Sequence, residues 1–332
     1  MNKKLVALAV SSLIAGTVSA QTANVVLYGR VDMVIENVRV TDGKGVTTST
    51  NRVTDGAAGG LSGSRWGLRG SESLGGGLNA VFQLEGGTNA DVGSLGQGGL
   101  LFGRQAYVGL NGGFGSVTLG RQYAPIFYVA DSLDSPAHDL SAQSVVGTFL
   151  RFSRINNSVI YSTPNMGGAS ASLLYGFGES AAGNSANRQV GANLQYANGP
   201  LYAGLGYHQA NGATGKRDGR SVNIGLGYDF GVVRPSLAYQ EHVNAAGTKF
   251  QSYVLTADIK AGGVTIEPQY GEEKNKTTGG KQKRLNLTAS YDLSKRTTTY
   301  ASLYNQKHSG SYITDTGVSK LNVFLVGFRN KF

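Results

Sequence analysis

Apolar and polar side chains alternate with a period of two along most of this chain, and no other feature limits its fold as strongly. In residues 190–196 (VGANLQY), every second side chain is apolar, and the positions between are glycine or amides. Successive side chains of a β-strand point to opposite faces of a sheet, so this segment predicts a strand with one apolar face. The pattern recurs in residues 201–207, 222–228, 233–240, 253–260 and 285–291. We therefore expect an all-β chain.

Composition indicates that part of the surface does not face water. Charged residues make up 15% of the chain, against roughly 25% in a soluble domain. The 332 residues include 50 Gly and 17 Tyr but no Cys. The lack of Cys excludes a disulfide framework, a thiolate nucleophile and a Cys-ligated metal site.

Alternation also fits a soluble β-sandwich, whose apolar faces point inward. Here the strand segments approach the roughly 9–11 residues that a tilted strand needs to span a bilayer. Tyrosine ends the apolar face of several segments, as in an interfacial aromatic girdle, at Tyr196, Tyr207, Tyr228, Tyr239 and Tyr291. These features favour a transmembrane barrel whose apolar side chains point outward.

The connections between segments are short and long by turns. The short ones, rich in Gly, Asn and Pro, are residues 73–77, 111–115, 164–168, 197–200, 229–231, 261–263 and 294–296. The long ones centre on residues 41–63, 87–101, 124–153, 179–187, 210–220, 243–250, 272–283 and 307–319. Fifteen connections predict a 16-stranded antiparallel barrel with a water-filled lumen, because outer-membrane barrels have short turns on one side and long loops on the other.

Residues 1–20 have the pattern of a secretory signal peptide. Lys3 and Lys4 precede an apolar stretch over residues 5–14, and residues 18–20 (VSA) form a cleavage site, so we expect cleavage after Ala20. An anchor helix is the alternative, but the stretch is shorter than the roughly 20 residues that a spanning helix needs. Residues 21–332 then form a single barrel domain with 28 cationic and 20 acidic residues, a net charge of +8.

Five stretches, in order along the chain, resemble the general porin family of β-proteobacterial outer membranes. They are NVVLYGRVD (24–32), SRWGLRGSESLGGG (64–77), FGRQAYVGLNGGFGSVTLGRQYAP (102–125), RINNSVIYSTP (154–164) and VGFRNKF (326–332). The resemblance spans essentially all of residues 21–332. It implies a homotrimer of 16-stranded barrels in the outer membrane of a Gram-negative bacterium. It also implies that the third loop, residues 124–153, folds into the pore.

The chain end resembles the signal that the barrel-assembly machinery reads. Phe332 is the last residue, and Phe328 stands in the alternating apolar row before it. A resemblance of this kind implies the assembly machinery, outer-membrane lipid and lipopolysaccharide as partners.

Alternation also predicts which charges face the lumen. Apolar residues occupy the alternate positions of these strand segments, so Arg30, Arg65, Arg69 and Arg154 should point inward, and Asn156 with them. Arg104 would point outward by alternation, but the family pattern places an arginine at this position on the pore wall, and a β-bulge would reconcile the two. Arg121 is expected to point outward. The expected constriction is a basic wall opposite the acids of the third loop: Arg30, Arg65, Arg69, Arg104 and Arg154 facing Asp131, Asp134 and Asp139.

Fixed charges across a narrow wet gap select ions by sign. Five arginines against three aspartates, together with the net charge of +8, predict passive diffusion of small anions and hydrophilic solutes. A substrate-specific channel and a barrel adhesin are the alternatives.

Other classes of function have less support in the sequence. The chain has four His and contains no H-E-x-x-H, G-x-S-x-G or G-x-x-x-x-G-K motif, so we expect no enzyme. No D-x-D-x-D-G calcium loop is present, and no cofactor is expected. The basic residues are scattered, so nucleic acid is not an expected partner.

Overall fold

The computed structural model of the chain describes residues 24–134, 144–145 and 151–332. The expected signal peptide, with its cleavage site at Ala20, lies outside these residues. Within the described part, no helix is long and apolar enough to cross a membrane.

The strands form one closed antiparallel barrel, which confirms the predicted fold class and the number of sixteen strands. Each strand pairs with its neighbours in sequence, and β1 (Asn24–Asp42) closes the ring against β18 (Val318–Lys331). The first half of β1 pairs with β3 (Arg65–Gly75), and its second half pairs with β2 (Thr47–Asp55). β2 and β3 therefore form one interrupted strand of the barrel. Residues 56–64, which connect them, are not part of the barrel wall.

The remaining strands follow in order around the barrel. β5 (Ser94–Leu95) is a two-residue strand that pairs only with the end of β4 (Leu78–Asn89). The others are β4 (Leu78–Asn89), β6 (Gln105–Gly112), β7 (Gly115–Tyr123), β8 (Arg154–Ser162), β9 (Ala169–Gly176), β10 (Gln189–Asn198), β11 (Leu201–Asn211), β12 (Arg217–Tyr228), β13 (Val233–Val243), β14 (Lys249–Ala261), β15 (Val264–Asn275), β16 (Lys281–Asp292) and β17 (Thr297–Ser309).

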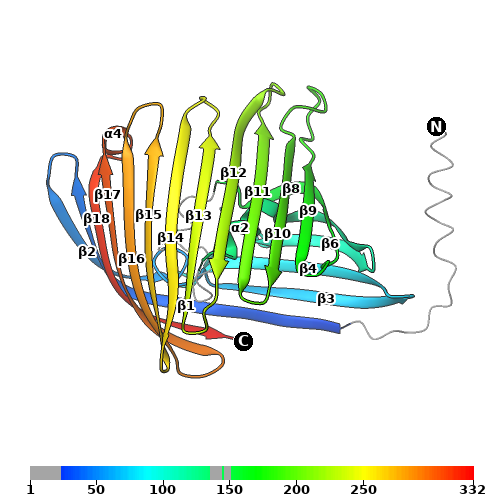
Figure 1. Ribbon diagram of the computed structural model, residues 1–332, viewed down its shortest axis with the longest axis horizontal. Coiled ribbons are helices and arrows are strands. Elements are labelled where there is room, and N and C mark those ends of the chain that lie inside the picture. Colours follow the sequence, from blue (N-terminus) through cyan, green and yellow to red (C-terminus); the bar gives the residue numbers. More distant parts are fainter. Residues whose placement is uncertain (1–23, 135–143, 146–150) are drawn as a thin grey trace.

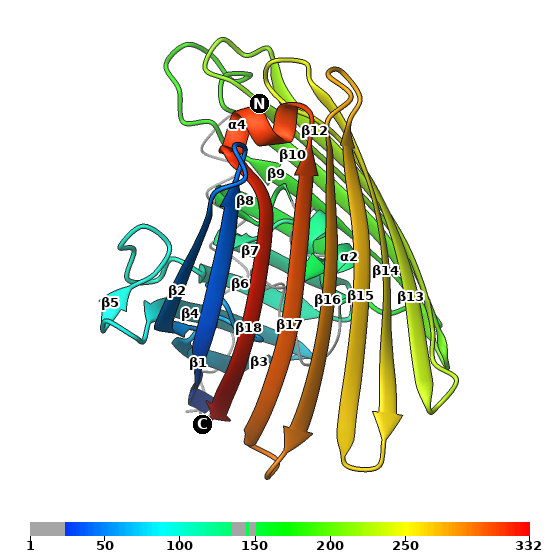
Figure 2. The same cartoon turned by 90° about the vertical axis from the view of Figure 1, so that its left-hand side faces the viewer.

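All seven predicted short turns join consecutive strands at one end of the barrel, and the longer connections lie at the other (Figures 1 and 2). The turn between β14 and β15 has only two residues, Gly262 and Gly263, and Gly262 adopts a φ of +63° that favours glycine. The chain end also closes the ring, because the backbone of Phe332 and that of Gly29 exchange two hydrogen bonds, of 3.0 and 3.1 Å.

The apolar rows point away from the barrel axis, the reverse of a soluble sandwich. Leu194, Leu205 and Ile224 are 45–56% exposed and lie side by side in register on β10, β11 and β12. The alternate residues Asn193 and Asn223 are buried on the other face. An exposed apolar band around a polar interior is what a bilayer-spanning barrel requires.

One stretch of the inner wall is apolar, and residues 56–64 cover it. Leu61 is only 1% exposed and packs in a cluster with Val34, Tyr300, Tyr304 and Leu325, which come from β1, β17 and β18. In the sequence of β18, apolar residues occur on both faces. The apolar residues of its inner face pack in this cluster. The long loop predicted at residues 41–63 therefore includes β2 and part of a segment that folds into the barrel.

Candidate pore constriction

Arg104 points into the barrel although simple alternation would turn it outward. It directly precedes β6, and its Nε lies 2.6 Å from Oε1 of Glu85, with both side chains less than one-tenth exposed. Its backbone N–H donates to the carbonyl of Glu85, which is the register partner of Gln105. Two successive residues, Arg104 and Gln105, are thus buried against the same inner wall, as at a β-bulge.

Tyr123 joins Arg104 to Arg154. The Tyr123 hydroxyl accepts hydrogen bonds from Nη2 of Arg104 (2.7 Å) and from Nη2 of Arg154 (2.6 Å). The Arg154 guanidinium also lies over the Tyr123 ring, 4.5 Å from its centroid, and the ring stacks on Phe127. A cation over an aromatic face is attracted by the ring quadrupole, so Tyr123 holds both arginines at the end of β7.

The other predicted arginines lie on the neighbouring strands. Arg65 stands opposite Arg30 in the register of β1 and β3, and its Nε donates to the carbonyl of Gly63 (3.1 Å). The Arg69 guanidinium lies 5.2 Å from the centroid of the Tyr28 ring. The Tyr28 hydroxyl in turn donates to Oε2 of Glu85 (2.9 Å), so this network extends from β1 across to β8.

Two of the three acids predicted to face this wall lie in the described residues. Asp134 is buried and accepts a hydrogen bond from Nε2 of Gln269 on β15 (3.0 Å). Asp131 ends the short helix α2 (Pro125–Asp131) and is half-buried, and Asp139 lies outside the described residues. The contacts of Asp134 make it an anchor of the third loop, and the role of the three acids as the opposing wall stays a prediction.

Glu85 is an acidic residue of this network that the sequence analysis does not name. Phe82 and Leu84 are apolar, so alternation along β4 already places Gln83 and Glu85 on the polar face. The alternation that identifies Glu85 is present in the sequence, but Glu85 lies next to residues 87–101, which are expected to form a long loop.

Alternation also gives the wrong direction for two neighbouring residues of β8, Ile155 and Asn156. The register between β7 and β8 shifts after Gly120, and Asn157 has a φ of +51°. Ile155 is consequently buried on the inner face, and Asn156 accepts a hydrogen bond from Arg121 (2.5 Å). Arg121 pairs with outward-facing Ala106, in agreement with its predicted orientation. Asn156 therefore belongs to the outer face, because the bulge reverses the alternation.

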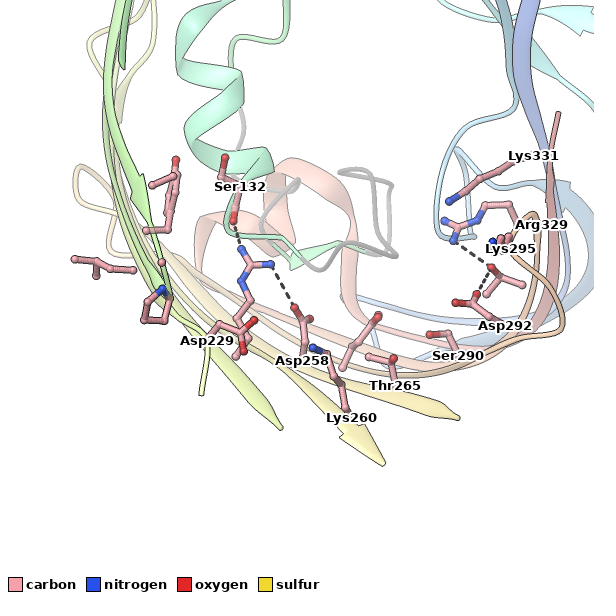
Figure 3. Close-up of a pocket in the computed structure, with 18 residues that line it drawn as sticks. Ser132, Asp229, Asp258, Lys260, Thr265, Ser290, Asp292, Lys295, Arg329 and Lys331 are labelled. Carbon is pink, nitrogen blue, oxygen red and sulfur yellow. Dashed lines mark hydrogen bonds and ion pairs between the residues drawn. The ribbon is translucent and has the colours of Figure 1, made fainter. Parts of the chain in front are cut away.

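The described part of the third loop lies against the inner wall. Nδ2 of Asn193 donates to the carbonyl of Pro125 (2.8 Å), and Oγ1 of Thr256 donates to that of Leu133 (3.1 Å). Glycine makes room for α2, since a Cβ on Gly206 would come within 2.9 Å of Ile126. Figure 3 shows the helix next to Ser132 enclosed by the curve of the barrel wall. The path of residues 135–143 and 146–150 is outside the described residues.

A cavity of about 710 Å³ opens beside α2 toward the short turns (Figure 3). Arg234 donates to the carbonyl of Ser132 and lies 3.5 Å from Asp258. Charges of both signs line this cavity, and the basic ones are Arg234, Lys260, Lys295, Arg329 and Lys331.

At the opposite end, Glu273 joins two loop segments to the wall. It forms an ion pair with Arg151 and accepts hydrogen bonds from Ser252 (2.9 Å) and from Tyr312 (2.5 Å). Tyr312 belongs to the short helix α4 (Ser311–Thr316), and burial together with the Glu273 carboxylate raises the pKa of its hydroxyl. The neutral hydroxyl therefore remains a donor, and it tethers α4 over this end of the barrel (Figure 2).

The described part of the chain also bears on the requirements of a metal site. Those residues contain no group of three or more His, Asp or Glu side chains that could hold a metal ion. The arrangement places fixed guanidinium groups along one side of the barrel interior.

Comparison with known proteins gives consistent results. A family model described as Gram-negative porin matches residues 6–311. Outer membrane porin protein 32 of Delftia acidovorans is 35% identical over 91% of this chain and 89% of that protein. An outer membrane porin protein of Bordetella pertussis is 32% identical over the full length of both chains. The solved structure of an anion-selective porin from Comamonas acidovorans covers 94% of this chain and 100% of that chain, with 31% identity and a TM-score of 0.78.

Proposed function

This chain belongs to the Gram-negative porin family of outer-membrane proteins, and from this premise we propose that it is a general diffusion porin that prefers anions. Small hydrophilic solutes and ions would cross the outer membrane passively through its water-filled lumen. The family and the fold point to a channel rather than an enzyme, and we further propose that the chain has no catalytic activity and needs no cofactor.

The arginine network carries the anion preference. Arg104 and Arg154 meet at Tyr123, Arg30 and Arg65 stand opposite each other on β1 and β3, and Arg69 lies over the Tyr28 ring. Glu85 is one carboxylate bonded within this network. A ring of charges biased to one sign lowers the barrier for ions of the opposite sign. Arginine suits this role because it keeps its charge beside other cations. The anion-selective porin of Comamonas acidovorans, which shares 31% identity with this chain, adds support.

The reversal potential across a planar bilayer in a salt gradient tests this proposal. We expect anion preference for the native protein and a shift toward cations for Arg69→Gln and for Arg154→Gln. Arg121→Gln is the matched control, since this arginine lies on the outer face and should leave selectivity unchanged. Unaltered selectivity in Arg69→Gln and Arg154→Gln would remove those arginines from the constriction.

A substrate-specific channel is the second candidate, and the inner tyrosines favour it. Tyr28, Tyr107 and Tyr123 lie on the inner wall among the arginines, and Tyr202 lines the cavity beside α2. Such rings could guide one class of solute along the pore. Liposome swelling separates the two candidates, because rates ordered by solute size indicate general diffusion and one strongly preferred solute indicates a specific channel.

We also propose a homotrimer, as the family resemblance implies. Unboiled protein should migrate as a heat-modifiable trimer in detergent gels. A monomeric sedimentation profile of the folded protein in mild detergent would contradict this.

Processing and assembly complete the proposal. Cleavage after Ala20 would release residues 21–332 as the mature barrel, and Phe328 and Phe332 would present the chain end to the barrel-assembly machinery. Outer-membrane lipid and lipopolysaccharide would then surround the folded barrel.

A further inference from the structure

A row of uncharged polar side chains crosses the inner wall from β4 to β10. Ser116 on β7 stands opposite Ser162 on β8, which stands opposite Ser172 on β9. The row continues on both sides through residues in the same register, namely Asn79, Asn111 and Asn193. Leu173 and Leu194, which follow Ser172 and Asn193 in the sequence, are exposed on the outer face. The side chains of the row therefore point into the barrel.

A cavity of about 160 Å³ lies at the serine part of this row, between the wall and α2. The three serines line it together with Pro125 and Tyr128 of α2. Every side chain of its lining is uncharged, whereas the cavity in Figure 3 is lined by charges of both signs. One molecule of liquid water occupies about 30 Å³, so the space corresponds to about five waters, which is the scale of a single sugar ring.

The polar groups of the cavity can both donate and accept hydrogen bonds. The hydroxyl oxygens of Ser162 and Ser172 lie 2.8 Å apart. Only one of their two protons lies between them, so the other proton and the remaining lone pairs stay available to a ligand. Thr118 donates to Oε1 of Gln122 (2.6 Å), and Nε2 of Gln122 donates to the carbonyl of Ser158 (3.3 Å). This side of the cavity is therefore ordered in advance, which lowers the entropy cost of binding.

Tyrosine rings supply much of the apolar lining. The Tyr128 ring is 41% exposed and meets the rings of Tyr123 and Phe127 at steep angles, with centroid distances of 6.1 and 5.7 Å. The hydroxyl of Tyr107 donates to Gln83 (2.9 Å), which restrains the second ring. Restrained aromatic faces beside a few convergent polar groups are typical of small-molecule sites.

We propose that this cavity binds the ring of an uncharged sugar on its way through the pore. The sugar hydroxyls would bond to Ser116, Ser162 and Ser172, and the apolar C–H face of the ring would lie on Tyr128. Binding would be weak, because passage through a pore requires release as well as entry. The inference rests on the proposed channel and names the class of solute that its inner tyrosines suit, in addition to the anions attracted by the arginines.

The test measures single-channel current in a planar bilayer as arabinose is added. Triethylene glycol, an uncharged solute of nearly equal mass with fewer hydroxyl groups, corrects for viscosity and volume exclusion. Current through the native channel should fall with a saturating dependence on arabinose concentration and without saturation in the glycol. Replacing Ser116, Ser162 and Ser172 together by Ala should raise the half-saturating arabinose concentration at least about fivefold, because each lost hydrogen bond contributes about a factor of two or more.

Two substitutions of Tyr128 separate its ring from its hydroxyl. Tyr128→Leu removes the aromatic face and should weaken arabinose binding, whereas Tyr128→Phe keeps the ring and should retain most of the affinity. Equal affinity in native protein and in Tyr128→Leu would contradict stacking of the sugar on this ring.

Ser236→Ala, Thr265→Val and Ser290→Ala together form the matched control, with the same loss of hydroxyl groups from the inner face of β13, β15 and β16. This variant should keep the native half-saturating concentration. An unchanged value in the variant without Ser116, Ser162 and Ser172 would exclude the site, and equal saturation by the glycol would show obstruction instead of recognition. Reversal potentials separate these results from a failure of the proposed channel, since none of the variants changes a charge and anion preference should persist in all of them.

Discussion

Glu85 partly neutralises the positive charge that Arg104 presents to the lumen. Its carboxylate bonds both to the Arg104 guanidinium and to the Tyr28 hydroxyl. Glu85→Gln removes a negative charge from the network and should raise the ratio of anion to cation permeability, whereas Arg104→Gln should lower it. Each change should also cost about 1.5–3 kcal/mol of stability, since hydrogen bonds to charged groups are lost. Reversal potentials measure the first effect and thermal melting in detergent the second. Shifts of equal sign in the two variants would contradict this account.

Tyr123 allows the position of the arginines to be tested without a change of charge. Tyr123→Phe removes the hydroxyl that accepts from Arg104 and Arg154 but keeps the ring that stacks on Phe127. We expect a loss of about 1–3 kcal/mol, because two buried donors lose their acceptor. We also expect noisier single-channel currents, because the guanidinium groups become less restrained. Tyr161→Phe is the control, since its exposed hydroxyl bonds only to the backbone of Phe114 outside the lumen. Quiet currents in Tyr123→Phe would show that the ring alone holds the arginines.

Residues 56–64 lie inside the barrel against β1 and β18 and narrow its lumen there. Oδ2 of Asp32 accepts hydrogen bonds from the backbone and the hydroxyl of Ser62, and Tyr300 donates to the same carboxylate. Leu61 fills the apolar cluster behind them. This segment and α2 therefore lie against different parts of the inner wall, on two sides of the lumen.

Leu61→Ala tests the contribution of this segment. The substitution should cost about 2–5 kcal/mol, the usual effect of a large-to-small change in a packed cluster. Conductance should rise, because a segment that has lost its apolar anchor leaves more of the lumen open. Leu74→Ala, at an exposed short turn, should alter neither quantity appreciably. An unchanged conductance together with a lowered melting temperature would show that residues 56–64 stabilise the barrel but do not set its width.

The strands and the short turns could be predicted from the sequence, whereas the inward path of residues 56–64 could not. Alternation and turn chemistry depend on neighbouring residues, so β10 to β17 and all seven short turns could be found. Residues 56–64 are rich in Gly and Ala and show no period, and their place is set by Asp32 and Tyr300, which are distant in sequence. For the same reason, the five arginines could be named as inner charges, but their bonds to Tyr123 and Glu85 could not.

At the scale of the whole molecule, the fold depends on a lipid exterior around a wet interior. Leu194 and Gln195 are adjacent on β10 and point to opposite sides of the wall. Leu194 is 56% exposed on the outer face, and Gln195 accepts a hydrogen bond from Tyr202 on the inner face (2.9 Å). The same substitution at these two positions therefore compares its cost in lipid, outside the barrel, with its cost in water, inside the lumen.

Leu194→Arg should destabilise the folded barrel by about 2–4 kcal/mol, the cost of an arginine at the middle of the bilayer. Gln195→Arg should cost less, because water and the acids of the lumen solvate the new charge, and it should strengthen anion preference. Urea unfolding from lipid vesicles measures the stability difference, and reversal potentials measure the selectivity. Leu194 pairs with Leu205 near the centre of β10, so its depth makes it the more sensitive position. Equal destabilisation at both positions would mean that the two faces meet the same solvent, and the barrel could not then be a channel through a membrane.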